Sequence, residues 1–444
     1  MQSVHAFVFV FIACVEIYVL RRLRFDWPTV ALAVSGTLLS VTYSSYTDIS
    51  ERNYDGPAQV EYIQTLADTG RPPDVFACVA CGHPPLYYAL GAIWSKVTVV
   101  AGFVPLELRL QWLSLLLFFV FVAVALLIFR SSGAKPTTLR LAAALLVFWP
   151  SSVIHSVRVH NDALASPLLL AAAYFIARWD ERGRERDFRA ALATCVLALL
   201  TKSTGLTVAA TLLFFVAWRL LRRESRRAAA LRFVAATVVL FAAEFLAVGL
   251  RESGRPTTLC QRIFGHACNG RHVPVVPDTP SRFFSFDVRH FVSDIDALHG
   301  ATGHDYFLNR LLKSSLFGVA PLGDDFAGGL YAGLASCMSA LLLVMLAGCL
   351  LALPVTGGVS LRKFRTYVVM GAVMLVSLLA FRIAIPNEYH EDFRHIFPVL
   401  VPACLGYAKV VSRLGRFSQR LGQGGVCLAL LMMAASVAFF ARLP

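Results

Sequence analysis

The chain has 444 residues, of which 57% are hydrophobic and 15% are charged, and its mean hydropathy is +0.65. This composition excludes an ordinary soluble domain, in which about 25% of the residues are charged. The net charge of +14 does not indicate a nucleic-acid partner, because more than half of the 41 Lys and Arg residues lie in short loops between apolar stretches. Basic residues gathered in short loops are typical of the cytoplasmic side of a membrane protein.

Apolar stretches long enough to cross roughly 30 Å of hydrocarbon recur along almost the whole chain. We place twelve of them at residues 4–20, 29–45, 110–130, 138–154, 161–178, 188–203, 204–221, 230–250, 328–354, 366–385, 396–411 and 424–443. With the basic loops inside, these spans pair off and both termini lie outside. The sequence therefore predicts an all-α polytopic membrane protein with about twelve transmembrane helices.

The stretch 84–104 does not fit this parity as a full span, and we expect it to be juxtamembrane or re-entrant. Two long segments, 46–83 and 251–327, then lie on the external face, where we expect the chemistry. Amphipathic residues 58–66 and 307–317 predict helices that lie along the membrane surface. We divide the chain into an N-terminal catalytic transmembrane module (1–250), the large external loop (251–327) and C-terminal transmembrane helices (328–444).

Four of the ten cysteines lie outside the predicted spans, namely Cys78, Cys81, Cys260 and Cys268. In an oxidising compartment they can form two local disulfides. A zinc site that combines them with His266 is the alternative, although their spacing matches no familiar pattern of zinc ligands.

Four motifs follow one another on the predicted external face. The first runs from Asn53 to Leu90 and contains an Asp after an early span, a YIQTLADTG segment, an RPP turn and PPLYY. The others are VHNDAL at 159–164, LLTKSTG at 199–205 and EDFRHIFPVLVP at 391–402. In this order they resemble the polyprenyl-phosphate-dependent GT-C glycosyltransferases, a superfamily that includes protein mannosyltransferases and the lipid A aminoarabinose transferase.

The resemblance implies that Asp55 is the catalytic base, since such an enzyme deprotonates an acceptor hydroxyl while a lipid phosphate departs. The alternative is that Asp55 forms a turn and caps the following helix. Many relatives carry a second acidic residue directly after the Asp, whereas this chain has Gly56, which weakens the case for a metal held by an acidic pair. We expect no cofactor and leave metal dependence open.

Cations on the external face predict a site for the donor phosphate. Lys202 lies in a predicted external turn, and Arg394 with His395 opens an apolar run, positions that the positive-inside rule does not explain. Arg binds phosphate through two parallel hydrogen bonds and Lys as a point charge. The alternative is that these side chains extend to lipid headgroups.

Further polar residues of the motifs are candidates for contact with the sugar or the acceptor. They are His83, which replaces the Lys or Gln of many relatives, Tyr87, Tyr88, Asn161 and Asp162. His83 is equally typical of a solvated loop, and Asp162 of a helix cap.

We therefore predict a glycosyltransferase of the bacterial inner membrane whose active site faces the periplasm. We expect the transfer to invert the configuration at the anomeric carbon. Its partners would be a polyprenyl-phosphate-linked sugar, an acceptor on a lipid, glycan or exported protein such as pilin, and membrane lipids, but no nucleic acid. A transporter or lipid-linked sugar flippase is the alternative, and a non-catalytic scaffold is a third possibility. Transporters place paired charges near the bilayer midplane, whereas this chain places its polar residues at one surface.

Overall fold

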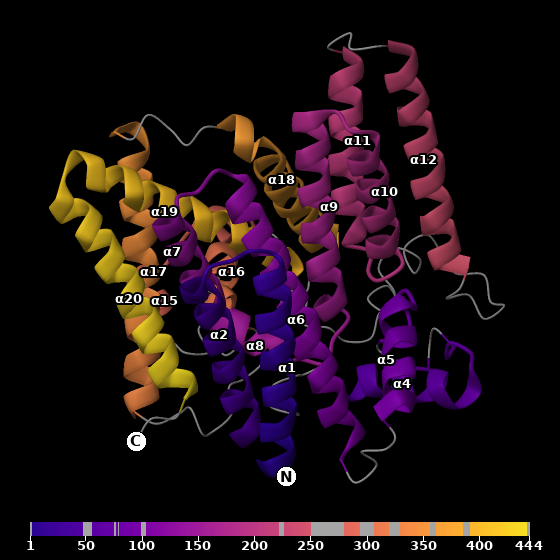
Figure 1. Ribbon diagram of the computed structural model, residues 1–444, viewed down its shortest axis with the longest axis horizontal. Coiled ribbons are helices and arrows are strands. Elements are labelled where there is room, and N and C mark those ends of the chain that lie inside the picture. The colour runs from indigo at the N-terminus through magenta and orange to yellow at the C-terminus, as the bar shows by residue number, and fades with distance from the viewer. Residues whose placement is uncertain are drawn as a thin grey trace.

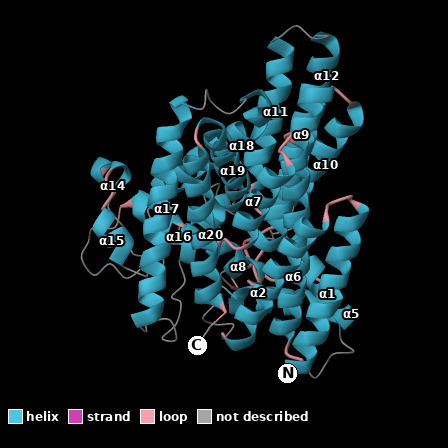
Figure 2. Cartoon of the chain, turned by 60° about the vertical axis from the view of Figure 1, so that its left-hand side comes forward, coloured by secondary structure: helices cyan, strands magenta, loops and turns pink. Residues whose placement is uncertain are grey.

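The computed structural model describes the chain in a series of segments, with the bounds 2–47, 56–74, 77–78, 80–98, 104–221, 226–249, 279–293, 306–318, 329–355, 361–384 and 391–441. All regular secondary structure in these segments is helical (Figures 1 and 2). The helices are α1 (Gln2–Arg22), α2 (Trp27–Tyr46), α4 (Gly56–Thr69), α5 (Leu86–Val97), α6 (Leu106–Ser131), α7 (Pro136–Val147), α8 (Pro150–Ser156), α9 (Asp162–Arg182), α10 (Glu185–Leu199), α11 (Gly205–Leu221), α12 (Arg226–Gly249), α14 (Pro280–Phe284), α15 (Val288–Ser293), α16 (Phe307–Phe317), α17 (Gly329–Val355), α18 (Leu361–Ala384), the 3-10 helix η5 (Phe393–Val399), α19 (Leu400–Phe417) and α20 (Gln419–Phe440).

The prediction of an all-α polytopic membrane protein is confirmed, and every predicted span overlaps one of these helices or a consecutive pair. Within the described segments, 6 helices are long and apolar enough to cross a membrane, or up to 7 if one bent pair counts as a span. The predicted number of twelve is therefore not confirmed. Some predicted spans are short or carry charges, as in α11, which has 17 residues, and α9, which ends in a charged turn.

The predicted span 138–154 is not one straight helix. It consists of α7 and α8, whose axes differ by 61°. Pro150 is the first residue of α8, and because it has no backbone N–H it cannot continue the hydrogen bonding of α7. The bend turns the chain toward the interior of the protein, where the segment after α8 contributes to the candidate site.

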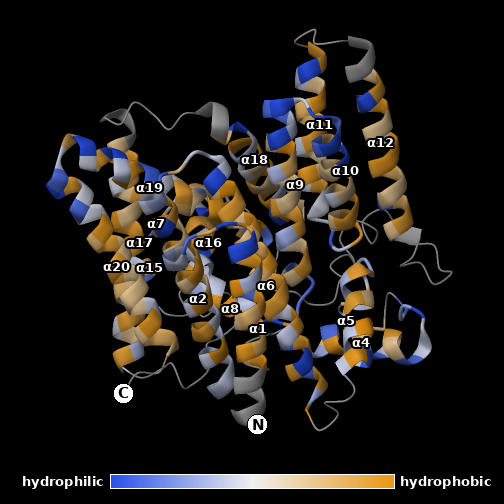
Figure 3. Cartoon of the chain, in the orientation of Figure 1, coloured by the Kyte–Doolittle hydropathy of each residue, from blue (hydrophilic) through white to orange (hydrophobic). Residues whose placement is uncertain are grey.

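The predicted cytoplasmic loops lie together at one end of the molecule. In Figure 1 the start of α1, the end of α20 and the α4–α5 pair lie at the opposite end from the start of α12, and Figure 3 shows hydrophilic residues at the tips of α9, α10 and α11. Basic residues of different loops contact partners in other loops, as in the pairs Arg140–Asp26 (Nη2 to Oδ2, 2.6 Å), Lys409–Ser132 (Nζ to O, 3.2 Å) and Arg365–Asp180. These contacts agree with the predicted grouping of the loops.

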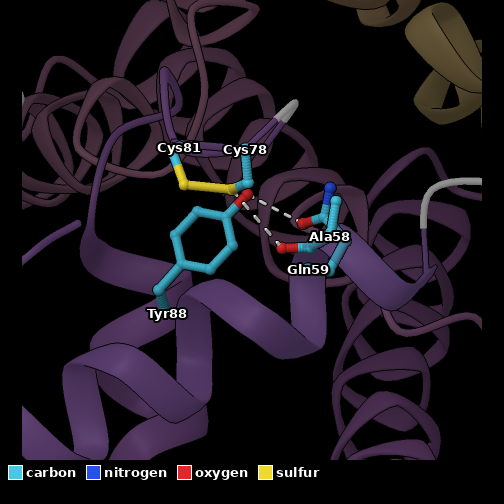
Figure 4. Close-up of a disulfide and its surroundings, with 5 residues drawn as sticks. All are labelled: Ala58, Gln59, Cys78, Cys81 and Tyr88. Carbon is cyan, nitrogen blue, oxygen red and sulfur yellow. Dashed lines mark hydrogen bonds between the residues drawn. A yellow bond between two sulfur atoms is a disulfide. The ribbon is translucent and has the colours of Figure 1, made fainter. Parts of the chain in front are cut away.

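Helices α4 and α5 form a small unit beside the transmembrane helices, closed by the Cys78–Cys81 disulfide (Figure 4). The Tyr88 ring stacks on Tyr62 with 3.7 Å between the centroids, and its hydroxyl donates to Gln59 Oε1 at 2.7 Å. The sulfur of Cys78 lies 3.8 Å from the carbonyl oxygen of Ala58, in the first turn of α4. At 12 residues, α5 is too short to cross a bilayer, as expected for a juxtamembrane segment.

The helix predicted at 307–317 is present as α16, but its predicted position on the membrane surface is wrong. Nine of its residues are buried, and it packs between α8, α17 and η5. Its polar side chains bond inside the protein, as in the hydrogen bond from Lys313 Nζ to Ser339 Oγ at 3.0 Å. The amphipathic pattern is therefore satisfied by a protein interior with polar partners.

The membrane topology is testable with single cysteines at two exposed positions, Ser281 in α14 and Arg186 in α10. If the basic loops are cytoplasmic, a membrane-impermeant maleimide should label them from opposite sides of sealed vesicles. The protein without either added cysteine gives the background from the native thiols. Labelling of both positions from one side would contradict the topology.

Candidate active site

A small pocket lies where α6, the α8–α9 connection and η5 meet. One part of its lining is aromatic and apolar, formed by Phe118, Phe121, Ala163, Pro167 and Phe397. The other part carries hydrogen-bonding and charged groups, those of Ser114, His155, Arg158, His160, Asp162, Ser166 and Arg394. A cavity with an apolar wall and two arginines suits an amphiphilic anion.

The local structure of residues 157–161 brings the polar groups of this connection to the pocket. Helix α8 ends at Ser156 and α9 begins at Asp162, and the chain between them contacts α6 at Ser114. Ser114 of α6 donates its hydroxyl to the carbonyl oxygen of Arg158 at 2.7 Å, which fixes the connection. Arg158 is only 6% exposed although it carries a full charge.

Asp162 is held by two neighbours in the protein interior. Lys202 Nζ lies 2.5 Å from its Oδ1, and His160 Nδ1 lies 2.9 Å from its Oδ2. Lys202 belongs to the α10–α11 turn, where Gly205 is required because a Cβ there would lie 2.5 Å from the backbone nitrogen of Leu199. The ion pair therefore joins the LLTKSTG turn to the VHNDAL motif.

Arg394 reaches the pocket from η5. The side chain of Asp392 caps this helix by accepting from the Arg394 backbone N–H at 3.0 Å, and its other oxygen lies 3.2 Å from Arg394 Nε. The Asp392 carboxylate thus fixes the position of both the backbone and the guanidinium group of Arg394. The Arg394 side chain is 17% exposed and lines the pocket.

Glu391, the residue before Asp392, is clasped by three arginines from three different helices. Arg382 Nε donates to its Oε1 at 2.7 Å, and Arg282 Nη2 donates to the same oxygen at 3.1 Å. Arg310 Nε lies 3.6 Å from Oε2. Because Glu391 is 1% exposed, this network binds the start of η5 firmly to α14, α16 and α18.

The structure brings several of the predicted site residues together. Arg394 and Asp162 line the pocket, and Lys202 pairs with Asp162. Asn161 is fully buried beside them, and neither atom of its amide has a hydrogen-bond partner among the described residues. Burial raises the pKa of the Tyr87 hydroxyl, and the nearby carboxylate of Asp162 raises it further, so this residue stays a neutral phenol.

Other predicted residues lie elsewhere or outside the described segments. Asp55 directly precedes the described part of α4, and Cys260, Cys268 and His266 also fall outside the described residues. Tyr88 bonds to Gln59 inside the α4–α5 unit, so its position does not support contact with a substrate. His83 and His395 do not line the pocket, and the His395 ring lies 6.3 Å from that of Phe381.

Sequence reasoning missed Arg158 and His155. Both line the pocket, and His155 Nε2 has no hydrogen-bond partner among the described residues. Arg158 stands four positions before Asp162, on the predicted external side, where the positive-inside rule does not account for it. Arg158 thus shows the same sequence signal as Lys202 and Arg394, a cation on the predicted external side.

The zinc alternative for the external cysteines is wrong as stated, because Cys78 and Cys81 are bonded to each other. Among the described residues, no group of three or more His, Cys, Asp and Glu could hold a metal ion. The carboxylates of the site instead have cationic partners.

This chain is similar in sequence to one protein family and in fold to several solved structures. Residues 82–246 match the family model described as dolichyl-phosphate-mannose-protein mannosyltransferase. The archaeal oligosaccharyltransferase AglB from Archaeoglobus fulgidus, in complex with an inhibitory peptide and a dolichol-phosphate, superposes with a TM-score of 0.54 at 13% identity, over 94% of this chain and 56% of that enzyme. The A. fulgidus oligosaccharyltransferase tethered with an acceptor peptide gives 0.53 at 13% identity, over 94% of this chain and 55% of that chain.

ArnT from Cupriavidus metallidurans bound to undecaprenyl phosphate is also similar, with a TM-score of 0.43 at 14% identity, over 93% of this chain and 76% of that enzyme. No curated protein sequence matches this chain. This chain therefore has the GT-C fold of membrane glycosyltransferases. The resemblance of its motifs to that superfamily is confirmed. Within that class, the segment from the disulfide loop to α12 matches the mannosyltransferase family model, and the chain spans about half the length of the archaeal enzymes.

The role of Lys202 can be tested through its pairing with Asp162. Asp162→Asn leaves a buried ammonium without its carboxylate, and we expect a loss of roughly 3–5 kcal/mol in the free energy of unfolding. Adding Lys202→Met removes the unpaired charge and should recover much of that loss. Thermal unfolding of the two single variants and the double variant in detergent measures the coupling. Additive effects would contradict an energetically important ion pair.

Proposed function

We propose that this protein is a glycosyltransferase that moves a sugar from a polyprenyl phosphate to an acceptor hydroxyl outside the cytoplasm, on a lipid, a glycan or an exported protein such as pilin. The observation that carries the proposal is that two arginines, Arg158 and Arg394, line the same pocket as three phenylalanine rings. A lipid-linked sugar phosphate has the matching chemistry, with an anionic phosphate next to an apolar chain. The dolichol-phosphate bound to the structurally similar archaeal enzyme supports this donor class.

In this proposal the two arginines bind the donor phosphate. A guanidinium offers two parallel N–H groups to phosphate oxygens, and it keeps its charge at every physiological pH. The phosphate gains negative charge as the glycosidic bond breaks, so the two cations stabilise the transition state more than the bound donor. Lys202 would act indirectly, by holding Asp162 at the edge of the pocket.

We further propose Asp55 as the base. It directly precedes α4, whose partner helix α5 buries Tyr87 close to Asp162. The acceptor oxygen attacks the anomeric carbon and its proton passes to the Asp55 carboxylate. The bond from that carbon to the phosphate oxygen breaks, and polyprenyl phosphate leaves with the electron pair. One displacement of this kind inverts the anomeric configuration. We place the enzyme in a bacterial inner membrane, with the site on the periplasmic face.

Arg158→Ala and Arg394→Ala test the phosphate site. Each change removes a charge-assisted contact worth roughly 1.5–3 kcal/mol, so we expect the affinity for undecaprenyl phosphate to fall by about tenfold or more. Binding to purified protein in nanodiscs measures this. Arg289→Ala serves as the control, because Arg289 lies in α15 and does not line the pocket. Unchanged affinity in both pocket variants would remove the donor site from this pocket.

Asp55→Asn separates the base from a helix cap. Asn caps a helix about as well as Asp, but its amide cannot accept the proton of the acceptor. We expect donor binding to persist and sugar transfer to fall by roughly 10² to 10⁴. Transfer assays with extracted lipid-linked sugars, run beside binding assays, measure the two quantities separately. Full transfer activity in this variant would exclude Asp55 as the base.

A further inference from the structure

We propose that Ser314 of α16 and Gly318, which directly follows this helix, are positioning residues that set the two arginines of the pocket. Neither residue lines the pocket, and α16 belongs to the long segment between α12 and α17. The inference rests on the proposed function, because it gives these residues a role in binding the donor phosphate.

Ser314 fixes the segment that carries Arg394. It is fully buried, and its Oγ accepts from the backbone N–H of Phe393 at 2.9 Å. The hydroxyl proton goes to the carbonyl oxygen of Leu311 at 3.1 Å, which orients the lone pair toward Phe393. Phe393 directly precedes Arg394, so this hydrogen bond sets where η5 begins relative to α16.

Gly318 sets the place of Arg158. It closes α16, and its N–H bonds to the carbonyl oxygen of Ser314 at 3.0 Å. Its φ of +70° and ψ of −171° define a conformation that essentially only glycine adopts. A Cβ at this position would lie 2.9 Å from Arg158 Nη2. The bare backbone therefore leaves the space that the Arg158 guanidinium fills.

Two other contacts hold α16 against the same elements. Arg310 of α16 approaches the Glu391 carboxylate at 3.6 Å, close to the start of η5. The indole N–H of Trp149, which precedes α8, donates to the carbonyl oxygen of Ser315 at 2.7 Å. Helix α16 thus contacts both parts of the chain that deliver an arginine, so a small shift of this helix would change the spacing of the two guanidinium groups.

The test compares Ser314→Ala and Gly318→Ala with matched controls. Ser315→Ala deletes a hydroxyl of similar burial that, among the described residues, bonds to Leu312 of its own helix. Gly183→Ala changes another glycine of positive φ, +68°, where an added Cβ would lie 3.8 Å from the nearest side-chain atoms. Gly183 follows the last residue of α9, whose first residue, Asp162, lines the pocket. The measured quantity is the affinity of each purified variant for undecaprenyl phosphate and for uncharged undecaprenol in nanodiscs.

We expect the two test variants to bind undecaprenyl phosphate roughly 10-fold to 100-fold more weakly, the size of one lost charged hydrogen bond, and to bind undecaprenol as before. The controls should keep both affinities within about twofold. If the two residues had a purely structural role, the substitutions would lower the affinity for both lipids equally or leave both affinities unchanged. Either result would overturn the proposal. If Gly318→Ala does not fold, Ser314→Ala decides alone.

Arg158→Ala and Arg394→Ala complete the experiment. If they lose the preference for the phosphate while Ser314→Ala and Gly318→Ala keep it, the positioning role is wrong and the donor site stands. If the arginine variants also keep the preference, the donor site itself is wrong and the positioning role falls with it.

Discussion

The ion pair between Asp162 and Lys202 is the contact on which the arrangement of the candidate site depends. Removing two charges from water costs several kcal/mol per ion, and a partner at 2.5 Å offsets that cost only where the geometry is good. The pair joins the first residue of α9 to the α10–α11 turn. That turn also holds the α4–α5 unit, because the Leu86 backbone N–H donates to the carbonyl oxygen of Leu200 at 3.0 Å. Three motifs distant in the sequence therefore meet at the α10–α11 turn.

In the segment from Glu391 to Phe397, buried charges are again paired with charges of opposite sign. Glu391 is buried with arginines from α14, α16 and α18, and Asp392 orients the neighbouring Arg394. Helices α14 and α16, which lie between α12 and α17 in the sequence, are thereby joined to the pocket. Charges gathered at one end of the helices favour chemistry at a membrane surface over a path through the bilayer.

The sequence predicted the positions of the helices well, because long apolar runs have few other uses than to face lipid or a protein core. It also identified Asp162, Lys202 and Arg394 as residues of one face, although not the pairing of Lys202 with Asp162. That pairing arises from tertiary structure between positions 40 residues apart. Helix α16 was misplaced because an amphipathic pattern reports two unlike faces, but not whether the apolar one meets lipid or protein. The α7–α8 bend was missed although Pro150 marks it, since a hydropathy average does not register a missing N–H.

Helix α7 rises only about 18 Å over its 12 residues, at 1.5 Å per residue, which is little more than half of a hydrocarbon core. After the 61° bend, α8 runs obliquely instead of completing the crossing. Six of the seven residues of α8 are buried, and the helix packs against α2, α6 and α16, so the bend lies inside the protein and does not face lipid. The residues that would complete a straight span instead carry the chain to Arg158 at the pocket.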